Sequence, residues 1–172
     1  MASNTERFNQ AYTAHYNLSR RALAPPGRIV PTTAARGVRL GLRANDATEL
    51  GTITYFVGNA ASFFIPPSQE DAPYLYEPAR HSGRLPRILI ITNFQSHNEH
   101  TQRGVGSAML REVLRIADMA DCQYIGVEMG ENQAAYEALG FDFIDQNAIT
   151  WCVSVAKLRA RLSPLRRLRE AP

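Results

Sequence analysis

The length and composition of the chain predict a single intracellular domain. Its 172 residues, 45% of them apolar, suffice for one α/β core but not for two, so we expect one domain over residues 1–172. The N-terminus lacks a signal-peptide pattern, and no apolar run approaches the roughly 18 residues that cross a bilayer, so we expect a cytoplasmic protein without a transmembrane segment. Cys122 and Cys152 lack CxxC spacing, which indicates reduced core residues and neither a zinc site nor a disulfide framework.

The net charge of +3 hides a strong segregation of charge along the chain. Residues 1–43 carry a charge of +6, residues 44–156 carry −8, and residues 157–172 carry +5. The centre is therefore acidic and both ends are basic. Basic ends of this kind leave open a partner that is acidic or made of RNA.

The first third of the chain is predicted to hold a helix and then two strands. Ser3 and Glu6 form a capping-box pattern, so we expect an N-terminal helix within residues 1–24, stopped by the prolines that follow. Residues 37–57 alternate apolar and polar side chains around a polar turn, which predicts two strands. The segment SFFI, residues 62–65, is predicted to continue as a short strand.

Residues 66–86 are predicted to form a proline-rich insertion loop. The segment PPSQEDAPYLYEPARHSGRLP holds five prolines, two tyrosines and three acidic residues before Arg80. A loop of this length in a compact domain is usually functional or disordered. Two interpretations stay open: a flap that covers a bound cation with its acids and tyrosines, or a disordered surface insertion.

The second half of the chain predicts alternating strands and helices. Residues 87–94 form a nearly continuous apolar run, typical of a strand buried on both faces. The next segment, residues 107–120, has helical apolar spacing at Met109, Leu110, Val113, Leu114 and Ala117. A strand over 123–129, a short helix over 132–139 ended by Gly140, and two final strands follow.

The basic tail, residues 157–172, spaces its leucines by three or four residues with arginines between them. Such an amphipathic helix can lie on nucleic acid or on an anionic membrane. The favoured alternative is a terminal helix that lays its leucines on its own domain or on a partner in a homodimer.

Two glycines stand directly before the predicted helix. The run Gly104-Val105-Gly106-Ser107 joins a strand to a helix N-terminus, where backbone N–H groups and the helix dipole favour an anion. A dinucleotide fingerprint would need Gly or Ala in place of Met109, and a P-loop would need a lysine that is missing here. The sequence therefore predicts a phosphate site of another kind.

The segments TQRGVGSAML and AAYEALGFDFI together resemble two motifs of the GNAT superfamily of acyl-CoA N-acyltransferases. These are a pyrophosphate loop, Q/R-x-x-G-x-G/A, and a later Y-x-x-x-G-F, and the resemblance covers roughly residues 85–155. In the favoured register Gly104 and Gly106 are the motif glycines and both lie in the loop. A shifted register that begins at Arg103 also fits. The resemblance implies a mixed α/β domain whose twisted, largely antiparallel sheet is splayed at its centre and carries helices on both faces.

The same resemblance implies transfer of an acetyl group from acetyl-CoA to a primary amine. The amine acceptor would belong to a small molecule, a peptide or protein, or an aminoacyl-tRNA. The alternative function is a catalytically silent module that binds coenzyme A or a protein or RNA partner. The residues expected to bind acetyl-CoA are Phe94, Ser96, Thr101, Gln102, Arg103, Gly104, Val105, Gly106, Ser107 and Asn132.

Two residues are expected to carry the chemistry. Tyr136, in the second motif, would assist the departing thiolate. Because a phenol has a pKa of about 10 and a thiol about 8.5, a strengthening hydrogen bond is favoured over full proton transfer. The alternative for Tyr136 is a purely structural aromatic. Glu128 is the leading candidate for the base that deprotonates the amine, and the other candidates are His97, Glu99, His100 and Glu77.

Overall fold

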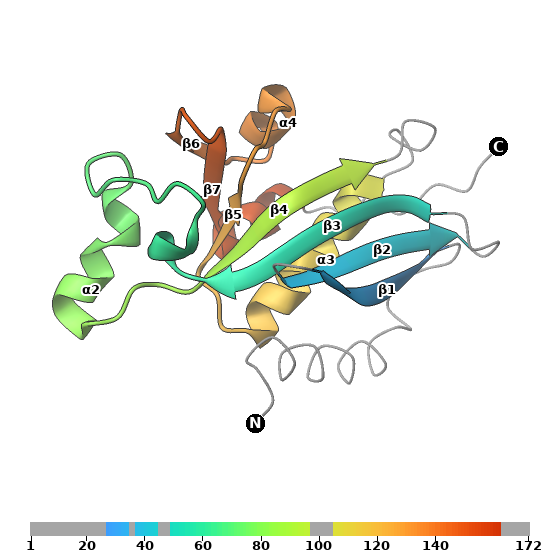
Figure 1. Cartoon of the computed structure of the whole chain (residues 1–172), viewed down its shortest axis with the longest axis horizontal. Coiled ribbons are helices and arrows are strands. Elements are labelled where there is room, and N and C mark those ends of the chain that lie inside the picture. Colours follow the sequence, from blue (N-terminus) through green and yellow to red (C-terminus); the bar gives the residue numbers. More distant parts are fainter. Residues whose placement is uncertain (1–26, 35–36, 45–48, 97–104, 163–172) are drawn as a thin grey trace.

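The computed structural model describes residues 27–34, 37–44, 49–96 and 105–162, and these form one seven-stranded sheet with helical segments on both faces (Figure 1). The strands lie in the order β1-β2-β3-β4-β5-β7-β6. Among the described strands, β4 (Ile88–Ser96) and β5 (Tyr124–Val127) are the one pair that runs parallel. The predicted mixed, largely antiparallel sheet is confirmed, whereas the helix predicted within residues 1–24 lies outside the described residues.

Three strands before β4 form the N-terminal part of the sheet. β1 (Gly27–Ala34), β2 (Gly37–Ala44) and β3 (Glu49–Gly58) pair in antiparallel succession, and β3 pairs with β4. The sequence analysis missed β1, whose pattern is interrupted by Pro31. β1 lies at the edge of the sheet that the described strands form, and edge strands are where a sheet tolerates proline.

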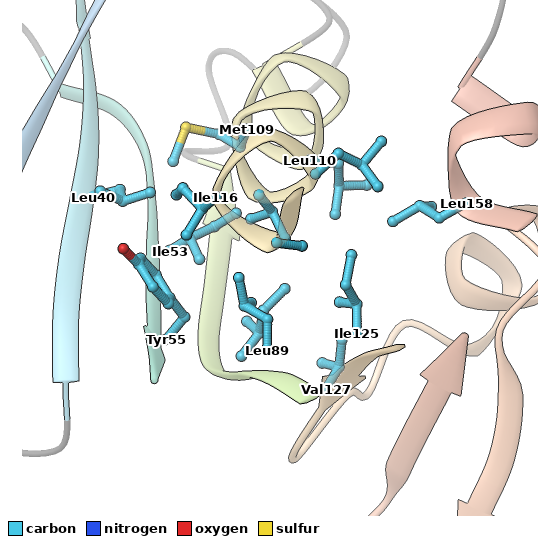
Figure 2. Close-up of a cluster of buried hydrophobic side chains, with 14 of the residues drawn as sticks. Leu40, Ile53, Tyr55, Leu89, Met109, Leu110, Ile116, Ile125, Val127 and Leu158 are labelled. Carbon is cyan, nitrogen blue, oxygen red and sulfur yellow. The ribbon is translucent and has the colours of Figure 1, made fainter. Parts of the chain in front are cut away.

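The long helix α3 (Val105–Met119) packs across one face of this sheet and forms the main core (Figure 2). All five residues of its predicted apolar stripe are buried. They meet side chains from β2 to β5, among them Leu40, Ile53, Leu89 and Ile125. The periodic spacing of the stripe therefore identified the buried face of α3 correctly.

A second, smaller core lies on the opposite face of the sheet. The 3₁₀ turns η2 (Ala60–Ser62) and η3 (Pro73–Leu75) and the helix α2 (Glu77–Ser82) connect β3 to β4. Their segment buries Phe63, Ala72 and Leu75 against Ile88 and Ile90 of β4, together with Ala60, Ile144 and Cys152.

This second core corrects two predictions. Residues 62–65 were expected as a strand. Ser62 instead ends η2, and residues 63–65 belong to no strand. Residues 66–86 are not a plain loop, because η3 and α2 lie within them and Leu75 is fully buried. Burial of apolar side chains gives this proline-rich segment a fixed place, which composition alone did not indicate.

The C-terminal part of the sheet continues directly into a helix. β6 (Asp142–Asp145) and β7 (Thr150–Ser154) lead into α5 (Val155–Leu162). Leu158 and Leu162 are buried in the main core, and Arg159 binds Asp118 of α3 through both carboxylate oxygens at 2.6 Å. Residues 163–172 lie outside the described part of the chain. No helix among the described residues has the length and apolarity that a membrane crossing requires.

Candidate active site

The strands β4 and β5 separate at a defined point, which we call the fork. Their parallel pairing runs from Ile88–Tyr124 to Ile91–Val127, and the last hydrogen bond goes from the Glu128 N–H to the Ile91 carbonyl at 2.9 Å. The fork comprises Thr92–Ser96 of β4 and Glu128–Gly130 after β5. The predicted splay at the centre of the sheet is therefore confirmed.

Two irregularities open the fork. On the β4 side, Thr54 pairs with Asn93 but Tyr55 pairs with Ile91, so Thr92 is an extra residue that bends the strand. On the β5 side, the next two N–H groups turn away from β4: Met129 donates to the Ala148 carbonyl and Gly130 to the Ile149 carbonyl, at 3.1 and 3.0 Å. Each arm of the fork thus pairs with its outer neighbour.

The β4 arm holds two of the residues predicted to bind acetyl-CoA. Phe94 pairs with Ile53 and Ser96 with Gly51, both in β3. No described strand pairs with this stretch on the side of the fork. Alternate backbone N–H and C=O groups of Thr92–Ser96 therefore face a gap in the sheet, where an N–H can donate to a carbonyl oxygen that gains charge.

The N-terminus of α3 lies beside this arm. Val105, Gly106 and Ser107 are the first three residues of the helix, whereas Thr101, Gln102, Arg103 and Gly104 lie outside the described residues. The register predicted both glycines in the loop, and this is wrong for Gly106, which sits in the first turn. The cost of glycine in a helix is its backbone freedom, and this cost is smaller at a helix end, where fewer hydrogen bonds depend on the residue.

The surroundings of Gly106 fit a ligand that approaches the backbone. A Cβ built on Gly106 would meet only ring carbons of Phe94, at 3.8 Å, among the described residues. This is ordinary van der Waals contact, so packing within the described chain does not require glycine at this position. A glycine at a helix N-terminus beside an open strand is instead suited to close approach by an anionic group such as a phosphate.

Tyr136 lies beside the other arm of the fork, on the same face of the sheet as α3. It belongs to α4 (Gln133–Ala138), and its ring stacks on Trp151 and meets Phe141 edge-on, with centroid distances of 5.7 and 5.4 Å. The Trp151 indole donates to the Gly130 carbonyl at 2.8 Å. A Cβ on Gly130 would lie 2.8 Å from the Tyr136 ring, so only glycine lets the fork and the tyrosine meet so closely.

Glu128 lies at the fork on the opposite face of the sheet. Ile125 and Val127 of β5 point into the α3 core, so alternation turns Glu128 to the other side. Its side chain is only 6% exposed, and its Oε1 accepts a hydrogen bond from the Phe64 N–H at 2.8 Å. The phenol and the carboxylate predicted to carry the chemistry therefore approach one gap in the sheet from its two faces.

The other predicted site residues are Asn132, His97, Glu99, His100 and Glu77, and the structure describes two of them. Asn132 is the N-cap of α4, and its side-chain oxygen accepts from the Ala135 N–H at 3.2 Å. His97, Glu99 and His100 lie outside the described residues. Glu77 is exposed at the start of α2, which Figure 1 shows on the side of the sheet where β4 begins, away from the end where β4 and β5 separate.

The predicted flap, residues 66–86, begins two residues after Phe64, whose N–H binds Glu128 at the fork. Its later part lies farther away, because Tyr74 contacts Tyr124, the first residue of β5, with ring centroids 5.4 Å apart, whereas the fork begins after Val127, the last. The flap therefore stays a prediction. Ala72 and Leu75 are buried in the second core. Their burial holds this part of the segment against the stretch where β4 and β5 are still paired.

Sequence reasoning missed two strained residues at the fork. Met129 has φ of +55° and Ile149 has φ of +49°, and the hydrogen bonds described above join the two turns to each other. A left-handed backbone is costly for Met and more so for a β-branched Ile, and such strain is concentrated at functional sites. No sequence signal could have revealed it, because Gly and Asn are the residues that mark left-handed positions.

Comparisons with known proteins find structures that are similar to this chain in fold. No protein-family model matches the chain, and no curated protein matches it significantly. Among solved structures, a mutant of the toxin AtaT bound to the C-terminus of the antitoxin AtaR matches 81% of this chain and 99% of its own, at 10% identity and a TM-score of 0.53. A second structure, described as a bacterial toxin, matches 77% of this chain and 75% of its own, at 11% identity and a TM-score of 0.51. At 10–11% sequence identity these matches show a shared fold and no more.

Proposed function

We propose that this chain, which has the fold of the GNAT superfamily, is an N-acetyltransferase that moves the acetyl group of acetyl-CoA to a primary amine. The observation that carries the proposal is the fork. It is a gap between two parallel strands with a helix N-terminus and a phenol on one face and a buried carboxylate on the other.

The two faces of the fork suit the two substrates. The α3 face offers backbone N–H groups at the helix N-terminus, which favour the phosphates of acetyl-CoA. Placing acetyl-CoA there brings its thioester toward the open backbone of Phe94–Ser96 and toward Tyr136. The amine then approaches from the face that holds Glu128.

Each residue then has a defined task. Glu128 accepts a proton from the ammonium group, which frees the nitrogen lone pair to attack the thioester carbonyl carbon. A backbone N–H of the β4 arm stabilises the negative charge on the carbonyl oxygen. Tyr136 donates a hydrogen bond to the sulfur as the C–S bond breaks. The nitrogen gives up its second proton as the amide forms, and this proton goes to the departing sulfur or to water, so that coenzyme A leaves as the thiol or thiolate.

The pKa of Tyr136 determines whether its hydroxyl donates a hydrogen bond to the leaving sulfur or transfers its proton. Burial raises this pKa above its ordinary value, because the phenolate is poorly solvated beside Trp151 and Phe141. The hydroxyl is therefore protonated at neutral pH and can donate. Full transfer of its proton to a thiolate with a pKa of about 8.5 is uphill, so the hydrogen bond is the favourable contribution.

The need for Glu128 depends on the acceptor. At pH 7, deprotonation of a lysine-like amine costs about 4.6 kcal/mol, whereas an α-amine costs about 1 kcal/mol. A buried carboxylate beside the fork is the group that an acceptor of high pKa requires. Its Oε1 accepts a hydrogen bond from the Phe64 N–H, which helps to hold the carboxylate in place at the fork.

Thermal denaturation with acetyl-CoA tests the proposal. At a hundredfold excess over the dissociation constant we expect acetyl-CoA to stabilise the fold by about 2.7 kcal/mol. Gly106→Val is expected to abolish this stabilisation, because its side chain would occupy the space beside the α3 N-terminus. Without acetyl-CoA the variant should melt close to the wild type, since Phe94 is the one described side chain near the added Cβ, at an ordinary contact distance of 3.8 Å.

Release of free thiol in the presence of pooled amines, peptides and aminoacyl-tRNA then tests turnover. Wild-type protein that is not stabilised by acetyl-CoA contradicts the proposal. Stabilisation without thiol release for any acceptor class supports the alternative, a module that binds coenzyme A without turnover.

A further inference from the structure

Glu128 has two neighbours with exposed apolar side chains, one bound to it through its backbone and one next to it in the chain. Phe64 is 75% exposed, although its backbone N–H is bound to the Glu128 carboxylate. Met129, the next residue in the chain, is 61% exposed. Single exposed apolar residues are common on protein surfaces, but two that adjoin one buried carboxylate at a gap in the sheet form a distinct chemical environment.

The position of Phe64 is held by its neighbours. Asn59 and Ser62 form a capping box around η2, in which the Asn59 side chain accepts from the Ala61 N–H at 2.9 Å and Ser62 Oγ accepts from the Asn59 N–H at 3.0 Å. The buried ring of Phe63 lies directly against Gly126, where a built Cβ would come within 2.5 Å of it. These contacts and the hydrogen bond to Glu128 keep the exposed Phe64 at the fork.

The position of Met129 is held by strain and pairing. Its left-handed backbone interrupts the alternation of β5 immediately after Glu128, and its N–H is bound to the Ala148 carbonyl. A chain that keeps an exposed methionine in an unfavourable conformation needs a compensating reason, and contact with a ligand supplies one. Methionine also adapts readily to apolar ligands of varied shape.

We propose that Phe64 and Met129 bind the apolar part of the acceptor, so that the acceptor is a primary amine attached to an aliphatic or aromatic body. The inference rests on the proposed function, since it names the class of amine that reaches Glu128. The ammonium group faces the carboxylate and the face of the Phe64 ring, which attracts cations. The carbon chain covers the two apolar side chains and removes them from water.

Binding of two matched amines tests this proposal. n-Hexylamine and 2-(2-aminoethoxy)ethanol have chains of the same length, but two ether or hydroxyl oxygens make the second one polar. We expect calorimetry, with and without coenzyme A, to show about tenfold tighter binding of hexylamine to the wild-type protein. Phe64→Ser and Met129→Ser should each reduce this preference, and both residues are exposed enough for the fold to tolerate the change.

Phe143→Ser is the matched control. Phe143 is 47% exposed and pairs with Trp151, which points into the α3 core, so it lies on the face away from Glu128. Its loss should leave the preference for hexylamine unchanged. The proposal is overturned if the wild type binds the two amines equally or binds neither, or if Phe143→Ser removes the preference as Phe64→Ser does. Stabilisation by acetyl-CoA is measured in parallel, so a failure of the proposed function is seen separately.

Discussion

Tyr136 occupies a position where structure and chemistry make different demands on one side chain. Its ring fills the space between Trp151 and Phe141, which any aromatic residue could do, and only its hydroxyl can serve a reaction at the fork. Tyr136→Phe keeps the packing and removes the donor. The substitution therefore separates the catalytic interpretation from the purely structural one.

For Tyr136→Phe we expect kcat on the true acceptor to fall by about 10²- to 10⁴-fold, while acetyl-CoA stabilises the variant as it does the wild type. Steady-state kinetics and thermal denaturation measure the two effects. Because the pKa of Tyr136 is raised, loss of activity through its ionisation should appear only above pH 10 in the wild type. Unchanged turnover in the Phe variant would assign Tyr136 a structural role.

Met129 tests whether the fork stores strain. Met129→Gly removes a side chain that is mostly exposed and gives the left-handed position the residue that tolerates it best. We expect the free energy of unfolding to stay the same or rise by up to about 1 kcal/mol, measured by urea denaturation. The matched variant Met129→Ala keeps the strain and should show no gain. Equal destabilisation of both variants would mean that the methionine side chain stabilises the fork.

At the scale of elements, the segment from η2 to α2 is a structural support of the sheet. Leu75 of η3 is fully buried among Ile88, Ile90 and other residues of the second core. Leu75→Ala should therefore lower the free energy of unfolding by about 2–5 kcal/mol, whereas Glu70→Ala, an exposed change in the same segment, should stay within about 0.5 kcal/mol. Urea denaturation of the two variants measures the difference. Equal stability would mean that this segment does not support the sheet.

Elements with one clear buried face were the most predictable. The apolar stripe of α3 follows the helical period, so its residues could be assigned to the core without any partner in view. β1 was missed because an edge strand can hold a proline, and the turns η2 and η3 were missed because they are short and irregular. Their burial depends on remote partners, which local spacing does not encode.

At the scale of the whole molecule, the buried thiols make stability depend on alkaline pH. Burial raises the pKa of Cys122 to about 11 and that of Cys152 to about 12, from an ordinary value of 9.0. Between these values the unfolded chain has lost protons that the folded chain keeps, so stability falls as pH rises from about 9 toward 11. The buried Tyr55, whose pKa is also raised, adds to this trend at the upper end.

We therefore expect the urea midpoint to fall as pH rises above 9, and the double variant Cys122→Ala, Cys152→Ala to show a shallower fall. The slope with pH is the informative quantity, because replacing buried thiols also changes the stability at neutral pH. A midpoint that is flat across this range in the wild type would mean that the two thiols ionise as easily in the folded chain as in the unfolded one.

The sequence by itself determined the order of strands and helices after residue 87, the buried face of α3 and the candidate Glu128, and the resemblance of two of its motifs to the GNAT superfamily supplied the class of sheet and the candidate Tyr136. These follow from periodicities and motifs that lie within short segments. The tertiary structure alone decided which residues meet at the fork. Phe64 reaches Glu128 across 64 positions of sequence, and the faces on which Tyr136 and Glu128 lie depend on the strand register and on the place where β4 leaves β5. Such pairings depend on the burial of side chains in two cores, one on each face of the sheet. That burial involves residues from many segments, so the sequence of one segment does not predict it.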